Sequence, residues 1–474
     1  MDPVPKPRAP GAWPDMSSLK LLAQDSVAVG AQLQYVFTAL TTATGIVTAI
    51  LALVVIGLAI AFKRTIPVMS GLGMYFVTYQ LTPNVEANTL IGPFQATRIA
   101  SKSIAVGLLL IAIAYVPSLP RPGRSSIAGA SAVAFLCFQL FYALQFAIFA
   151  GDGLLKGAFG IVAMCLMFGV FAWGFGKSAE DASGAAAKLE TMTWAGMGFI
   201  ATNLIQVALD PSGALMSGRL AGTAGNAQMM GGIAVMFLLA AGFQFAWLPA
   251  SRPLKWVNLL AICALGALIL ATGSRTAALA SLVGVAVLFR SQLGKFSIIA
   301  VILAFGYVAL GFIFEESARL TIDRFSGGQN TREAGWTDSL AIFANSPVFG
   351  EFPFLQPGEE PNGIESTFIR TLANMGLVGA AVLLVPVLLC CRDALLAIQL
   401  ARSAPEYRKI CDFYLAACAS LLVLNTFDGY AFGFMTFPVI FTYTVLAVGG
   451  LLAEKAKDNV ATDHDYEAVD SDAI

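Results

Sequence analysis

The sequence is poor in charge and almost without histidine. Of its 474 residues, 12% are charged and 57% are hydrophobic, and the formal net charge is -1. The mean hydropathy is +0.76, whereas soluble domains carry about one quarter charged residues. The scarcity of charge indicates that a lipid bilayer is the solvent of most of the chain. The charges include no basic excess that would favour nucleic acid as a partner.

The single histidine, His464, follows the last apolar stretch. That position excludes Ser-His-Asp and Cys-His catalysis as well as histidine metal sites. The seven cysteines lie in or beside apolar stretches and lack the paired spacing of zinc or redox sites. We interpret them as small hydrophobic residues, although the adjacent Cys390 and Cys391 leave open a lipidation site. We expect neither a cofactor nor a metal.

Apolar stretches that could cross a bilayer follow one another along most of the chain. About 20 apolar residues cross as a helix, because every backbone N–H and C=O must be bonded internally there. The sequence predicts an all-α, polytopic transmembrane helix bundle with about 12 to 13 spans. The candidate spans are 36–62, 66–82, 103–118, 126–150, 157–175, 192–210, 225–248, 254–272, 274–290, 297–314, 364–390, 411–426 and 431–453.

The polar segments divide the chain further. Residues 1–35 form a polar N-terminal segment, and 36–453 form one transmembrane domain. Residues 454–474 are polar and acidic, so we predict a disordered cytoplasmic tail.

Arginines and lysines in short loops predict the orientation, because cytoplasmic loops are enriched in them. Such residues lie between the eleventh and twelfth spans and after the final one: Arg392, Arg402, Arg408, Lys409, Lys455 and Lys457. The C-terminus should therefore be cytoplasmic, and residues 315–363 should form one large periplasmic loop. Thirteen crossings would leave the N-terminus outside, and twelve would leave it inside; both stay open.

Several arginines lie outside this cytoplasmic belt: Arg219, Arg275, Arg319, Arg324, Arg332 and Arg370. An arginine at the centre of a membrane helix costs about 2.5–3.5 kcal/mol on insertion scales, so these positions need an explanation. The planar guanidinium binds two phosphate oxygens at once, which favours a diphosphate headgroup as the shared ligand. The alternative is that each arginine reaches lipid phosphates or pairs with a nearby acid.

Polar residues also recur within the span over 192–210. Asn203, Gln206 and Asp210 are spaced i, i+3 and i+7, which places them on one helical face. They could contact sugar hydroxyls in a wet cavity, or they could form hydrogen bonds between helices. The spacing fits both interpretations.

Glu365 opens the helix that follows the large loop. A helix N-terminus stabilises a carboxylate, and a base at a partly dry site needs that effect balanced against desolvation. Glu365 is therefore a candidate general base. The alternative is that it only complements the helix dipole.

Four stretches, in order, resemble the O-antigen ligase and polymerase superfamily, the Wzy and WaaL relatives. They are the loop from Arg219 to Gly225-Asn226, the turn Gly273-Ser274-Arg275-Thr276, the stretch from Arg332 and Trp336 to Pro347 and Gly350, and the helix segment Asn374-Met375-Gly376-Leu377-Val378-Gly379. The likeness is close over about 200–380, and the rest is similar in layout.

The resemblance implies a GT-C-like, metal-independent glycosyltransferase of the bacterial inner membrane. Its donor and acceptor would be oligosaccharides linked to undecaprenyl diphosphate, with a chain-length regulator and a flippase as further partners. The candidate catalytic residues are Glu365, Arg275 and Arg332. The candidate substrate-binding residues are Arg219, Arg370, Arg324, Asn203, Gln206, Asp210 and Asn226.

The resemblance also bears on the reaction. Ligases of this superfamily carry a histidine near the helix start, where this sequence has Glu365 and Ser366. This difference favours a polysaccharide polymerase that joins repeat units on the periplasmic face. The alternatives are a ligase that transfers glycan to lipid A core or protein, and a flippase that moves the lipid-linked oligosaccharide.

Overall fold

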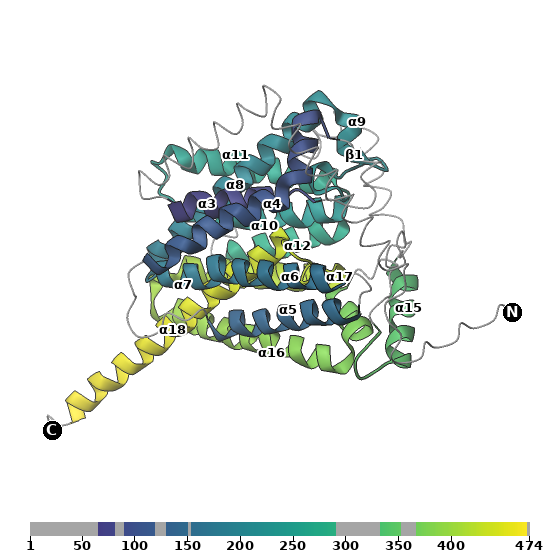
Figure 1. Cartoon of the computed structure of the whole chain (residues 1–474). Coiled ribbons are helices and arrows are strands. Elements are labelled where there is room, and N and C mark those ends of the chain that lie inside the picture. Colours follow the sequence, from purple (N-terminus) through teal and green to yellow (C-terminus); the bar gives the residue numbers. More distant parts are fainter. Residues whose placement is uncertain are drawn as a thin grey trace. The chain divides into compact units, whose positions relative to one another are not determined.

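The computed structural model describes residues 65–80, 90–118, 129–149, 153–290, 332–351 and 366–471 (Figure 1). Over these residues, nine helices are long and apolar enough to cross a membrane. The prediction of an all-α polytopic bundle is therefore confirmed, and the chain is a multi-span membrane protein. The predicted spans 36–62 and 297–314, and most of the large loop, lie outside the described residues.

The first half of the bundle contains α3 (Thr65–Phe76), α4 (Gly92–Tyr115), η2 (Val116–Ser118), α5 (Ala130–Phe149), α6 (Gly153–Met167), the π-helix η3 (Phe168–Trp173), α7 (Gly174–Ser178) and α8 (Ala182–Leu209). A short connection follows, with α9 (Pro211–Ala214), β1 (Leu215–Met216), β2 (Arg219–Leu220) and η4 (Gly222–Ala224). The second half contains α10 (Ala227–Trp247), α11 (Pro253–Ala271), α12 (Arg275–Leu288), α15 (Arg332–Asn345), α16 (Thr367–Ser403), η6 (Pro405–Tyr407), α17 (Arg408–Phe427) and α18 (Phe437–Ser471).

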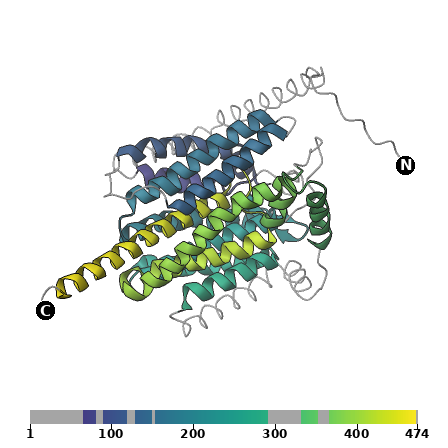
Figure 2. The ribbon, with the colours of Figure 1, turned by 90° about the horizontal axis from the view of Figure 1, so that it is seen from below.

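Helices α10 and α18 form the centre of the bundle. In each of these helices, 83% of the apolar membrane-crossing stretch is buried inside the protein, against 33% in α4. Two glycines of α10 allow neighbouring elements to approach closely: a Cβ on Gly231 would meet the Ala277 Cβ at 2.8 Å, and one on Gly232 would overlap with the Tyr430 ring. Small residues serve this purpose in membrane helix packing generally. Figure 2 shows α16, α17 and α18 lying together.

Several helices are longer than the apolar stretches predicted. Helix α8 begins at Ala182 rather than near 192, because Asp181 caps it by accepting from the Gly184 N–H at 2.7 Å and its first turns are rich in alanine. Helix α4 begins at Gly92 rather than near 103, with a proline in its first turn. First turns rich in small and polar residues hide both helix starts from a search for long apolar stretches.

Residues 454–474 were predicted to form a disordered tail, but the structure is helical over most of this segment. Helix α18 continues through the polar segment to Ser471. Extending an existing helix avoids the unfavourable nucleation step, and Lys455 and Asp458 form an i, i+3 pair at 4.0 Å. The low hydrophobicity that predicted disorder does not prevent such an extension.

Helix α16 is broken at Gly376, where φ is 61° and ψ is -160°. The N–H groups of Leu377 and Val378 donate to the carbonyls of Pro347 and Val348, at 2.8 and 3.1 Å. The segment after α15 therefore supplies the partners that the broken helix lacks, as membrane-embedded backbone requires. This pairing gives a structural reason why the motifs contain Pro347, Gly350 and Gly376.

We predict that Gly376→Ala destabilises the fold by at least about 2 kcal/mol. The φ and ψ values of this residue are almost restricted to glycine, and an added Cβ would overlap with the Val348 carbonyl oxygen. Thermal unfolding in detergent measures the effect. The matched control is Gly107→Ala in α4, where a Cβ meets nothing within 4 Å and alanine is the better helix former. Equal midpoints for the two variants would contradict the prediction.

Candidate functional site

Three connections meet at one end of the bundle, which we call the arginine end. They are the connection 210–226, the turn 272–275 between α11 and α12, and the turn 428–436 between α17 and α18. Figure 1 shows β1 and α15 near this end, while the last turns of α18 leave at the opposite end.

Arg219 links two of the predicted motifs. It lies on β2, opposite Met216 of β1, and its Nε donates to the Thr272 carbonyl at 2.8 Å. Thr272 caps the C-terminus of α11, where carbonyls lack partners within the helix. The bond therefore holds the half-buried Arg219 against the turn that carries Arg275, only three residues further along the chain.

The turn itself is tightly built. Gly273 has a φ of 58°, which glycine adopts without steric strain. Ser274 caps α12 by accepting from the Ala277 N–H at 3.3 Å, so Arg275 becomes the first residue of that helix. The Arg275 side chain is half-buried.

Asn226 and Tyr430 join the start of α10 to this end. The Asn226 side chain is exposed and caps α10 by accepting from the Gln228 N–H at 2.7 Å. The Tyr430 hydroxyl donates to the Gln228 carbonyl at 2.6 Å. The turn 428–436 is thus fixed to the helix that follows the Arg219 connection.

Packing of α12 on α17 brings the Arg332 stretch to the same end. The Ser420 hydroxyl donates to the Ala280 carbonyl at 2.9 Å, which sets the antiparallel register of the two helices. One to two turns further in this direction, α12 begins at Arg275 and α17 ends at Phe427. The Phe427 ring stacks on Trp336 of α15 at 6.4 Å and 19°. Arg332 begins α15, and its side chain lies outside the described residues.

Arg370 is placed one turn into α16. Its guanidinium lies over the Phe432 ring at 4.9 Å, a cation–π contact. Thr367, one turn earlier, makes a hydrogen bond with the Asn425 Oδ1 at 2.7 Å and accepts from the Ala431 N–H at 3.4 Å. The start of α16 is therefore anchored to the turn 428–436.

The polar face of α8 forms hydrogen bonds between elements. Asn203 is fully buried; its Nδ2 donates to the Phe199 carbonyl at 2.9 Å and its Oδ1 accepts from the Thr223 N–H at 2.9 Å. Gln206 is also fully buried and accepts from the Ile91 N–H at 2.9 Å. These contacts fit the second interpretation of the i, i+3, i+7 pattern, in which the face joins helices and loops.

Asp210 ends α8 and caps α9. Its carboxylate accepts from the Gly213 N–H at 3.0 Å and from the Ser212 hydroxyl at 2.7 Å. The bond from the Gly213 N–H, followed by that from Ser212, holds the pKa of Asp210 below its usual value. The ionised carboxylate thus helps to fold the connection that carries Arg219.

Arg98 is a residue that the sequence did not reveal. It lies on α4, has no exposed surface, and donates from Nη2 to the Gly222 carbonyl at 2.7 Å. The one available signal was a basic residue just before the apolar stretch predicted over 103–118, and such residues are usually solvated. The other missed feature is the break at Gly376. Glu365 and Arg324 lie outside the described residues, so their predicted roles are untested.

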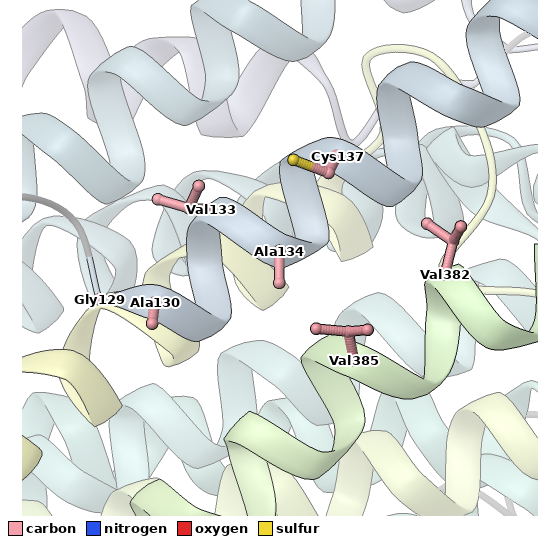
Figure 3. A pocket seen from close by; sticks show the side chains of 7 residues that line it. All are labelled: Gly129, Ala130, Val133, Ala134, Cys137, Val382 and Val385. Atoms are coloured by element: carbon pink, nitrogen blue, oxygen red, sulfur yellow. The ribbon is translucent and has the colours of Figure 1, made fainter.

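An apolar groove of about 610 Å³ runs between α5 and α16 (Figure 3). Its lining is hydrocarbon apart from one thiol: Gly129, Ala130, Val133, Ala134, Cys137, Val382 and Val385. Such a surface suits a hydrocarbon chain, and we assign it no part in binding phosphate or sugar.

The fold and the arginine end together define a class of protein: a multi-span helical membrane protein with arginines on adjacent connections at one end. Residues 259–384 match the model of the O-Antigen ligase family. No curated protein matches the chain. This match places residues 259–384 in the Wzy and WaaL family of polymerases and ligases, as the motifs within that range predicted. Membership implies an enzyme that transfers glycans, with lipid-linked glycans as substrates.

We predict that the stabilising effect of Asp210 depends on pH. Because its pKa is lowered in the folded protein, the stabilisation is complete above the ordinary pKa of about 4 and is lost as the pH falls through the lowered value. The difference in thermal midpoint between the wild type and Asp210→Ala should therefore shrink below about pH 4. Asp210→Asn keeps an acceptor without a charge, so its thermal midpoint should exceed that of Asp210→Ala by an amount that does not vary with pH. A constant difference down to pH 3 for Asp210→Ala would rule out the ionic contribution.

Proposed function

We propose that the chain is a polysaccharide polymerase that joins oligosaccharide repeats carried on undecaprenyl diphosphate. The observation that carries this proposal is the bond from Arg219 to the Thr272 carbonyl, because it brings two arginines of separate motifs to one place. The arginine end would face the periplasm of a bacterial inner membrane. The basic residues of the opposite end, such as Arg290 and Arg392, fit cytoplasmic contacts.

Electrostatics supports a diphosphate ligand. Arg275 is the first residue of α12, and a helix N-terminus carries a partial positive charge that disfavours a cation. A diphosphate would interact favourably with Arg275, with the helix terminus and with the neighbouring Arg219. Arginine suits this role because its planar fork matches phosphate oxygens and keeps its charge at every physiological pH.

The proposed reaction is a single displacement. The hydroxyl of the acceptor sugar attacks the anomeric carbon of the donor, the bond from that carbon to the diphosphate oxygen breaks, and the electron pair leaves on the diphosphate. Arg219, Arg275 and Arg332 would stabilise the growing charge, which is the role a metal ion plays elsewhere. Glu365 would accept the hydroxyl proton. We expect inversion at the anomeric carbon.

A ligase is the second candidate, because the matching family model is described as an O-Antigen ligase. Ligases of the superfamily carry a histidine near the start of the helix that here becomes α16. Ser366 occupies this part of the chain, where it caps α16 by accepting from the Ile369 N–H at 3.5 Å. This helix start therefore supplies a cap where ligases supply an imidazole, which favours the polymerase.

The central experiment supplies the purified chain with lipid-linked repeats in the presence of EDTA and without nucleotide sugar. A polymerase should produce a ladder of longer lipid-linked products. In cells, loss of a polymerase should leave single repeats on the carrier facing outward. Loss of a ligase would instead leave long polymer on the carrier, and loss of a flippase would leave repeats facing the cytoplasm.

We predict that Arg219→Ala, Arg275→Ala and Arg332→Ala each lower kcat/KM for chain growth by about 100-fold or more. Lysine variants should recover part of the rate, because lysine keeps the charge without the planar fork. The matched control is Arg290→Ala, which breaks the 2.6 Å ion pair with Asp412 at the opposite end. It should leave the rate per folded protein unchanged. Normal polymer from the three arginine variants would remove the proposed diphosphate site.

We predict that Glu365→Gln slows chain growth by about 100-fold, because the amide cannot accept the acceptor proton. The pH profile should separate this role from a helix-dipole effect. A base gives a rate that rises with pH through its pKa, and the glutamine variant should lose that rise. Wild-type turnover by Glu365→Gln would show that no carboxylate is needed at this position.

A further inference from the structure

Arg98 is a cation that the fold encloses completely. It lies in the second turn of α4, a helix long and apolar enough to cross a membrane, and its exposed fraction is 0%. Removing a guanidinium from water is costly unless good partners replace the water. One of its partners is a backbone carbonyl, that of Gly222, which accepts from Nη2 at 2.7 Å. This bond joins α4 to the connection that carries Arg219.

Gly222 and its neighbour Thr223 are held from three directions. Gly222 has a φ of 48°, and a Cβ there would overlap with the Asn203 Oδ1. Thr223 donates its N–H to the Asn203 Oδ1 at 2.9 Å and accepts from the Gln80 N–H at 3.1 Å. Helices α4 and α8 and the segment after α3 thus fix the same short piece of backbone.

That piece of backbone is directly joined to Arg219. Ala221 donates its N–H to the Ala214 carbonyl at 3.0 Å, and β2 pairs with β1 through Leu220 and Arg219. Only two residues separate Arg219 from Gly222, and hydrogen bonds hold the chain between them. A shift of Gly222 would therefore move Arg219 relative to the Thr272 carbonyl.

We infer that Arg98 is a positioning residue for the diphosphate site, acting through Gly222 to hold Arg219 beside the turn that carries Arg275. This inference rests on the proposed function, since it assigns Arg98 to the site proposed to bind diphosphate. Arg98 itself does not need to touch the substrate. Its effect on binding should pass through Arg219, whereas a residue that only stabilises the fold would lower stability without changing the affinity of the folded protein.

A double-mutant cycle on ligand affinity separates these roles. The full chain is purified in detergent, and farnesyl diphosphate serves as a soluble isoprenoid diphosphate whose Kd is measured by calorimetry. We expect Arg98→Met and Arg219→Ala each to raise the Kd by about 10-fold, and the double variant to stay within about 3-fold of Arg219→Ala, because residues that act through one another are not additive. Arg98→Lys keeps a charged donor and should stay within about 3-fold of the wild type.

The control is Arg290→Met, which removes the ion pair with Asp412 at the opposite end and should lower thermal stability without changing the Kd. If Arg98→Met does not fold, Asn203→Ala replaces it, because this change removes the bonds to Thr223 and should show the same non-additivity with Arg219→Ala. Additive losses, or wild-type affinity of the folded Arg98 variant, would overturn the inference. The Kd cycle is read without turnover, so a wild type that fails to extend lipid-linked repeats would overturn the polymerase proposal separately.

Discussion

Backbone polar groups inside a membrane protein must find partners within the protein, and this requirement shapes the arginine end. The break at Gly376 leaves the N–H groups of Leu377 and Val378 without helical partners, and carbonyls of the segment after α15 accept from them. The connection at Gly222 is satisfied in the same way, by Arg98 and by the elements that hold Thr223. Irregular backbone is tolerated at both places because other segments of the chain complete its hydrogen bonds.

This completed backbone gives the arginines fixed positions before a substrate arrives. Charge stabilisation in a transition state is most effective when the stabilising groups need no rearrangement during the reaction. Arg219 is held by the Thr272 carbonyl and Arg275 by its place at the start of α12, while Arg370 rests on the Phe432 ring. The same contacts that satisfy the fold therefore orient the groups proposed to hold the diphosphate.

Much of this could be predicted from the sequence, because the apolar runs and the basic loops follow from membrane physics. The helical bundle and the turn containing Arg275 were predicted in this way. The starts of α4 and α8 were not, because first turns rich in small and polar residues carry little hydrophobic signal. Arg98 and Asn203 depend on contacts with residues 20 or more positions away in the sequence, with Gly222 and Thr223 as partners. Residue spacing could place Asn203 on a face, but it could not distinguish a sugar contact from a bond to a loop.

We propose that a short segment within this fixed frame decides between polymerase and ligase. Directly after this segment, Thr367 makes hydrogen bonds with the turn 428–436, and the break at Gly376 is bonded to the segment after α15, so the first half of α16 is held at both ends. Changes at Glu365 and Ser366 would then alter the group presented at the helix start without moving the arginines. An enzyme built in this way could exchange the acceptor chemistry while retaining the diphosphate site, which is how one fold could serve both reactions of the family.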